Sequence, residues 1–142
     1  MKYFCLLVVG SRSITDYEFV KKKLDYFLSN VINEYSVMIV SGGAYGVDSL
    51  AERYARERGY LLKVFKLYSD DWYKIDESTG ERVFDKSAGY KRNKEMHSYI
   101  AQFQNRGVVV FWDGKSKGSL HSINLAKQFE NPMRLIKVEE NE

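Results

Sequence analysis

The sequence predicts an α/β fold in which a doubly wound, mainly parallel sheet carries helices on both faces. Short apolar segments alternate with segments of helical periodicity along the chain. The clearest apolar segments are continuous, which is typical of parallel strands that are covered on both faces. Strict alternation of strands and helices also favours right-handed βαβ units.

Five apolar segments are the predicted strands. Lys63 and Lys66 interrupt the third, which indicates a position nearer the edge of the sheet. Cys5 lies in the first strand, where we expect it to be buried as a small apolar side chain. The predicted strands cover residues 3–9, 37–40, 61–67, 108–112 and 135–138.

Four helices are expected between these strands. The first begins at a capping box formed by Thr15 and Glu18, and its buried face continues to Val31 and Ile32. The second ends at Gly59, a residue suited to a helix C-terminus. The others place Met96, Ile100, Phe103, Ile123, Ala126 and Phe129 inward, and the last three helices cover about 47–58, 87–104 and 119–130. This order predicts one Rossmann-like domain over residues 1–142.

One segment is too long for an ordinary connection. Residues 69–86 are polar and rich in turn formers, and they include Trp72, Tyr73 and Phe84. A connection of this length in a compact domain is commonly a lid, a binding loop or a disordered segment. We therefore expect a lid or insertion loop at 69–86.

Composition excludes several classes of protein. The net charge of +3 is small and the charges are interspersed, whereas a duplex-DNA binder has a basic stripe. One cysteine and two histidines cannot make a structural zinc site. No apolar run reaches the length of roughly 20 residues that spans a bilayer. The expectation is a cytoplasmic protein with no metal, no cofactor and no membrane contact.

Glycine-rich segments follow three of the predicted strands. Ligands of open parallel sheets bind beyond the carboxyl ends of the strands, where the strand order reverses. Glycines let backbone N–H groups approach an anion, and helix N-termini favour negative charge. Tight turns alone would explain any one of these segments, but three at one edge favour a ligand site. The residues concerned are Gly10, Ser11, Arg12, Ser41, Gly42, Gly43, Gly46, Asp48, Asp113, Gly114, Ser116, Gly118 and Ser119.

Several side chains near these loops are candidates for ligand contacts. Arg12 and Arg92 can grip phosphate oxygens through their guanidinium groups. Trp72 either stacks on a base or anchors its loop to the core. The loops contain neither the GxxxxGK[ST] motif nor a GxGxxG motif after the first strand, which excludes a P-loop NTPase and argues against a standard NAD fold.

Catalytic candidates are few. Asp48 and Asp113 each cap a helix or tie down a loop, or else contact a ribose hydroxyl. His121, in the first turn of the last helix, is a candidate acid–base group, although an isolated histidine is more often neither ligand nor catalyst. Arg92 completes the set of catalytic candidates.

Five motifs in order resemble the YspA-like (YpsA-related) branch of the SLOG superfamily, which is also related to the LOG phosphoribohydrolases and DprA. They are GSR, SGGAYGVD, DW, AGYKRNKEM and WDGKSKGSLH, and the resemblance runs from about residue 4 to residue 130. The resemblance implies binding of a nucleotide or nucleotide derivative, for sensing or sequestration. It adds Asn93, within the fourth motif, to the expected nucleotide-binding residues.

The resemblance leaves two alternatives open: a nucleotide hydrolase that cleaves an N-glycosidic or phosphoester bond, and a DprA-like single-stranded nucleic-acid binder. The LOG enzymes have an arginine that Arg92 matches, but Ser122 stands where they have a glutamate. LOG-type hydrolysis is therefore not expected. The expected partner is a small nucleotide-like molecule, and a homo-oligomer remains open.

Overall fold

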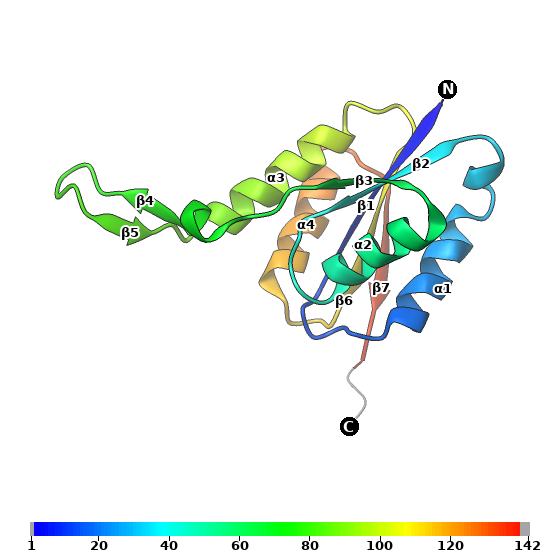
Figure 1. The fold of residues 1–142 in the computed structure, drawn as a ribbon, viewed down its shortest axis with the longest axis horizontal. Helices are drawn as coiled ribbons and strands as arrows, with labels where there is room; N and C mark the ends of the chain where they lie inside the picture. The colour runs from blue at the N-terminus through cyan, green and yellow to red at the C-terminus, as the bar shows by residue number, and fades with distance from the viewer. Residues whose placement is uncertain (1, 140–142) are drawn as a thin grey trace.

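The computed structural model describes residues 2–139, which form a five-stranded sheet with helices on both faces (Figure 1). The strand order is β3-β2-β1-β6-β7, and every neighbouring pair is parallel. The order reverses between β1 and β6, so the predicted doubly wound parallel sheet is confirmed. The strands are β1 Tyr3–Gly10, β2 Ser36–Ser41, β3 Leu61–Val64, β6 Arg106–Trp112 and β7 Met133–Lys137.

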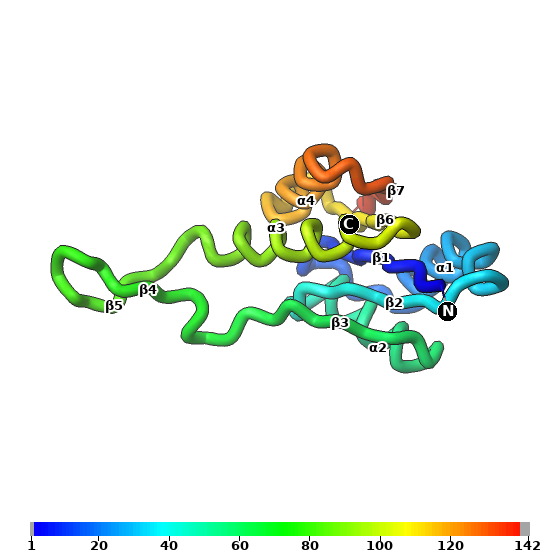
Figure 2. The backbone as a smooth tube through the Cα atoms, turned by 90° about the horizontal axis from the view of Figure 1, so that it is seen from above, coloured from blue at the N-terminus to red at the C-terminus, as the bar shows by residue number. Residues whose placement is uncertain are grey.

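The helices form two layers (Figure 2). Leu6 and Val8 of β1 pack into the core beneath α1 and α2. Cys5 and Leu7 pack into the core on the opposite face, beneath α3 and α4, and Cys5 is fully buried as predicted. This two-sided burial explains why the strand is continuously apolar. The helices are α1 Tyr17–Leu28, α2 Val47–Arg58, α3 Ala88–Ile100 and α4 Lys117–Gln128.

The ends of α1 differ from the prediction. Asp16 rather than Thr15 caps the helix, because its carboxylate accepts a hydrogen bond from the Phe19 N–H at 3.2 Å. The helix ends at Leu28, and Val31–Asn33 is a separate 3₁₀ turn (η1). The prediction of Ile32 on the buried face was wrong, since 52% of this residue is exposed.

Other helix and strand boundaries also differ from the prediction. The strand β3 is shorter than expected, because β2 ends at Ser41, whose carbonyl accepts the last bond of this pairing from the Phe65 N–H at 2.8 Å. Helix α3 ends at Ile100, so Phe103 lies beyond it and is only partly buried. Helix α2 ends at Gly59 in the left-handed conformation, as predicted. Within residues 2–139, no helix is long and apolar enough to cross a membrane.

The segment 69–86 has its own secondary structure. It forms a 3₁₀ helix, η2 Ser69–Trp72, and an antiparallel hairpin of β4 Tyr73–Ile75 and β5 Arg82–Phe84. The Asp76 carboxylate holds the turn by accepting the Ser78 N–H at 2.9 Å. Figures 1 and 2 show this hairpin extending away from the sheet and its helices. Strands of three residues, rich in charge, carry too little periodicity for the sequence to predict them.

Candidate functional site

A cleft of about 440 Å³ opens at the carboxyl ends of β1 and β6, where the strand order reverses. The β1–α1 turn, the start of α3 and the β6–α4 turn form most of its walls. The structure therefore brings together residues that are far apart in the chain. The predicted residues that line it are Gly10, Arg12, Asp48, Trp72, Arg92, Asn93, Asp113, Ser116, Gly118 and Ser119.

The remaining predicted residues lie outside this lining. Gly42 and Gly43 border a neighbouring cleft, which also contains Arg12 and Arg92. Ser11 and Ser41 are buried, and Gly46 and Gly114 belong to the turns that shape the loops. Sequence reasoning missed the other lining residues, which are Val9, Ser13, Ala44, Lys86, Gly89, Tyr90, Met96 and Ser122.

Two glycines let the β1–α1 and β2–α2 loops touch. A Cβ on Gly10 would lie 2.4 Å from Cγ2 of Val47. A Cβ on Gly46 would lie 2.7 Å from the carbonyl oxygens of Ser11 and Arg12, and Gly46 has a φ of +78°. Both positions exclude a side chain, so these glycines allow the close packing of the two loops.

Asp113 holds the β6–α4 loop. Its carboxylate accepts the N–H groups of Lys115 at 2.8 Å and Ser116 at 2.9 Å, and the hydroxyl of Ser13 at 3.0 Å. The Asp113 N–H donates to Oγ of the buried Ser11 at 3.0 Å. The backbone bonds from Lys115 and Ser116 lower the pKa of Asp113 to about 2. The geometry thus supports the loop-tying role for Asp113 and leaves its carboxylate a poor proton acceptor near neutral pH.

Asp48 holds the glycine loop after β2. Its Oδ2 accepts the Ala44 N–H at 3.1 Å, while the hydroxyl of the buried Ser41 accepts the Gly43 N–H at 3.2 Å. Asp48 is only 6% exposed. Burial raises the pKa of Asp48 to about 6, although the Ala44 N–H, Arg92 and Arg12 favour the charged form. The group therefore changes charge within the physiological range of pH.

Arg92 reaches across the site from α3. Its Nη1 donates to the carbonyl of Gly42 at 2.7 Å, and its Nε donates to Oδ1 of Asn93 at 3.1 Å. Burial lowers the pKa of Arg92, while the nearby Asp48 carboxylate raises it. Among residues 2–139, neither Arg92 nor Arg12 has a carboxylate oxygen within 4 Å of its guanidinium nitrogens. Two cations without close counter-ions therefore line one cleft.

The first turn of α4 faces the same cleft. Ser116 caps this helix by accepting the Ser119 N–H at 3.4 Å. The N–H groups of Lys117 and Gly118 belong to the first turn, where N–H groups have no partner within the helix. Within residues 2–139, no atom outside the neighbouring residues and the backbone of α4 itself lies within 4 Å of the position that a Cβ on Gly118 would occupy. The helix end therefore combines open space with a field that favours anions.

Trp72 joins the hairpin to the cleft. Its ring stacks on Phe84 with centroids 5.9 Å apart and planes inclined by 2°, and it would lie 3.4 Å from a Cβ on Gly89. From the segment 69–86, Trp72 and Lys86 line the cleft, whereas the hairpin tip extends away from it. The lid role of this segment stays a prediction.

The two histidines lie on the α3–α4 side. His121 contacts Tyr90 with ring centroids 4.6 Å apart, and its Nδ1 lies 3.4 Å from Nδ2 of Asn93, outside the cleft lining. Sequence reasoning missed His97, which is fully buried; its spacing from Asn93 and Ile100 would have placed it on the inner face. Burial lowers the pKa of His97 to about 4, so it is neutral at pH 7. Within residues 2–139, no group of three or more His, Cys, Asp or Glu is placed to hold a metal ion.

The raised pKa of Asp48 predicts an unusual dependence of stability on pH. The folded state binds the proton more tightly than the unfolded chain, so this contribution is present at low pH and lost as pH rises through about 6. Relative to Asp48→Asn, the wild type should gain about 1 kcal/mol of unfolding free energy between pH 7 and pH 5. Urea denaturation of both proteins at each pH measures this. A difference that does not change with pH would contradict the burial of a titrating carboxyl group.

Comparison with known proteins agrees with the resemblance seen in the sequence. Residues 5–72 match the YspA, cpYpsA-related SLOG family, and no curated protein matches the chain. Among solved structures, the fold is similar to that of the "predicted subunit of tRNA methyltransferase" from Methanocaldococcus jannaschii, with 13% identity and a TM-score of 0.38 over 96% of this chain and 68% of that one.

Proposed function

We propose, from the match of residues 5–72 to the YspA, cpYpsA-related SLOG family, that this protein binds a nucleotide or nucleotide derivative in the cleft between β1 and β6. By such binding the protein would sense or sequester the nucleotide. The observation that carries the proposal is Arg92, a half-buried cation without a close counter-ion that lines a cleft facing a helix N-terminus.

The chemistry of the cleft suits the parts of a nucleotide. A phosphate would bind between the Arg92 guanidinium and the first turn of α4, with Arg12 as a second cation at the rim. Trp72 and Tyr90, which also line the cleft, offer aromatic surface for a base. Gly118 leaves the backbone accessible, which supports close approach of the phosphate oxygens.

Calorimetric titration tests the proposal with AMP, GMP and their unphosphorylated nucleosides. At least one nucleotide should bind, and its nucleoside should bind at least about tenfold more weakly, because it lacks the group that the cations and the helix end recognise. Gly118→Ala should keep the fold, since a Cβ there meets no atom within 4 Å. The same variant should weaken nucleotide binding, because the methyl group enters the phosphate site. Equal binding of nucleotide and nucleoside would contradict a phosphate site.

The second candidate is a nucleotide hydrolase, which the pKa of Asp48, raised to about 6 in the cleft, favours. A group with such a pKa suits general acid–base catalysis. Against LOG-type activity, the position of the LOG glutamate is the buried Ser122, and the Asp113 carboxylate is occupied by backbone bonds. A positioned acid–base group contributes about 10²–10⁴-fold to a rate, and Ser122 cannot supply it near neutral pH.

We therefore expect no base release from AMP or N6-substituted AMP at ordinary enzyme rates. Chromatography of the free base after incubation with the protein measures this directly. Release at such rates that is lost in Asp48→Asn would favour the hydrolase instead, with Asp48 as its acid–base residue.

A further inference from the structure

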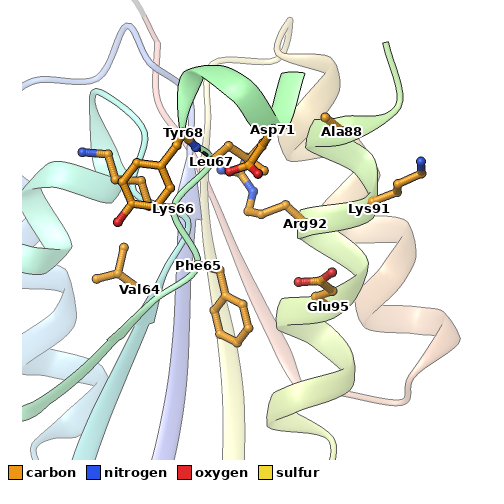
Figure 3. Close-up of a pocket in the computed structure, with 10 residues that line it drawn as sticks. All are labelled: Val64, Phe65, Lys66, Leu67, Tyr68, Asp71, Ala88, Lys91, Arg92 and Glu95. Atoms are coloured by element: carbon orange, nitrogen blue, oxygen red, sulfur yellow. Dashed lines mark hydrogen bonds between the residues drawn. The ribbon is translucent and has the colours of Figure 1, made fainter. Parts of the chain in front are cut away.

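Arg92 borders two clefts in addition to the one between β1 and β6. The first, of about 420 Å³, lies over the glycine loop and includes Gly42, Gly43 and Lys66. The second, of about 570 Å³, lies between α3 and residues 64–68 and is called the side cleft here (Figure 3). Arg92 is a lining residue of all three clefts.

The side cleft has walls of a different character from the phosphate site. Figure 3 shows Arg92 reaching from α3 toward the segment after β3, with Lys91 and Glu95 along the helix. Lys91 is paired with Asp85 at 3.3 Å, and both Glu95 and Asp71 bring negative charge to the walls. Apart from Arg92, the positively and negatively charged side chains of these walls nearly balance. Such walls suit a neutral group with hydroxyls, such as a nucleoside, better than a second phosphate.

Tyr68, a lining residue of the side cleft, lies beside Lys66 at its outer side, away from α3 (Figure 3). The residue is 67% exposed, yet its backbone is held, because the Tyr68 N–H donates to Oδ2 of Asp71 at 2.7 Å. The Nζ of Lys66 lies 5.8 Å from the ring centroid. An exposed aromatic ring on a fixed backbone loses little freedom when a flat base stacks on it.

We infer that the ligand is a two-part nucleotide, in which two nucleosides are joined through phosphates. The phosphates would bind at Arg92, one nucleoside in the cleft between β1 and β6, and the other in the side cleft against Tyr68. Each cleft alone has the size of a small-molecule pocket, about 300–1,000 Å³, so one mononucleotide leaves the side cleft unfilled. This inference rests on the proposed function and names the class of its ligand.

Titration with AMP, ADP and P1,P2-di(adenosine-5′) diphosphate, and with the three guanine counterparts, tests the inference. ADP has the same two phosphates without the second nucleoside, so it isolates the contribution of the side cleft. In the better-binding series, the dinucleotide should bind at least about tenfold more tightly than ADP, as base stacking on an aromatic ring implies. Tyr68→Ala should reduce this ratio to less than about threefold and leave AMP affinity within about twofold. Tyr26→Ala, a change of a 74% exposed tyrosine on α1, should leave the ratio unchanged.

Two results would overturn the inference while the proposed function stands: AMP binds but the dinucleotide gains nothing over ADP, or the gain persists in Tyr68→Ala. Failure of every probe, AMP and GMP included, would overturn both the inference and the proposed function. A tenfold gain that Tyr68→Ala removes and Tyr26→Ala keeps would support the inference.

Discussion

Replacing Arg92 with alanine is expected to weaken nucleotide binding about tenfold to a hundredfold. A hydrogen bond between a charged group and its partner contributes about 1.5–3 kcal/mol, and such a difference in free energy corresponds to this range of affinity. Arg92 lines the cleft with no carboxylate oxygen within 4 Å among residues 2–139, although the nearby Asp48 carboxylate raises its pKa, so we expect its charge to attract a phosphate. Calorimetric titration of the wild type and the variant with the same nucleotide measures the loss.

Two matched variants separate the role of Arg92 from a general effect of charge. Lys94→Ala removes an exposed cation from the same helix, outside the cleft lining, and should change affinity by less than about twofold. Arg92→Lys keeps the charge but loses the planar fork, so its affinity should fall between wild type and alanine. Circular dichroism should show that all three variants keep the fold. Equal losses in Arg92→Ala and Lys94→Ala would mean that only the net charge of the helix matters.

Gly46→Ala is expected to destabilise the fold by more than about 3 kcal/mol. Its φ of +78° with a ψ of −130° lies outside the left-handed helical region and costs an L-residue about 1–3 kcal/mol, and a new Cβ would also lie 2.7 Å from the carbonyl oxygens of Ser11 and Arg12. Backbone atoms cannot move aside as a flexible side chain can, so the β1–α1 and β2–α2 loops would have to separate. A loss of this size is a large part of the stability of an ordinary domain.

Gly59→Ala is the control for this prediction. Gly59 has a φ of +70° and a ψ of 25°, which is the left-handed conformation, and within residues 2–139 no atom outside its two chain neighbours lies within 4 Å of the position of its Cβ. It should therefore lose only the 1–2 kcal/mol or so that the left-handed conformation costs. Urea denaturation of both variants gives the comparison, and equal losses would show that neither the contact between the two loops nor the conformation of Gly46 adds to the cost of a side chain there.

The sheet could be predicted from the sequence because its strands are buried on both faces. The runs of apolar residues in β1 and β6 have no other explanation in a domain of this size, and alternation with helices then determines their direction. The boundaries were less predictable, since they depend on contacts between elements. The strand β3 ends early because its neighbour β2 ends at Ser41, whereas Asp16 and Thr15 are both suitable capping residues and the sequence does not decide between them. The β4–β5 hairpin has too few residues per strand to show periodicity.

The site was predictable in part for a similar reason. The carboxyl ends of parallel strands meet at one edge, so residues after β1 and β6 had to lie close together, as Arg12 and Asp113 do. The roles of individual residues depend on hydrogen bonds that spacing does not show. Asp113 has its carboxylate occupied by backbone N–H groups, and Arg92 reaches Gly42 across the sheet. The side cleft had no sequence signal, because its walls come from α3 and an irregular segment.

A crystal structure of the protein grown with AMP tests the central claim most directly. The proposed function predicts the AMP phosphate between the Arg92 guanidinium and the N–H groups of the first turn of α4, with the nucleoside in the cleft between β1 and β6. An AMP molecule bound only at surface lysines away from this cleft, with Arg92 and Gly118 free of contact, would contradict it.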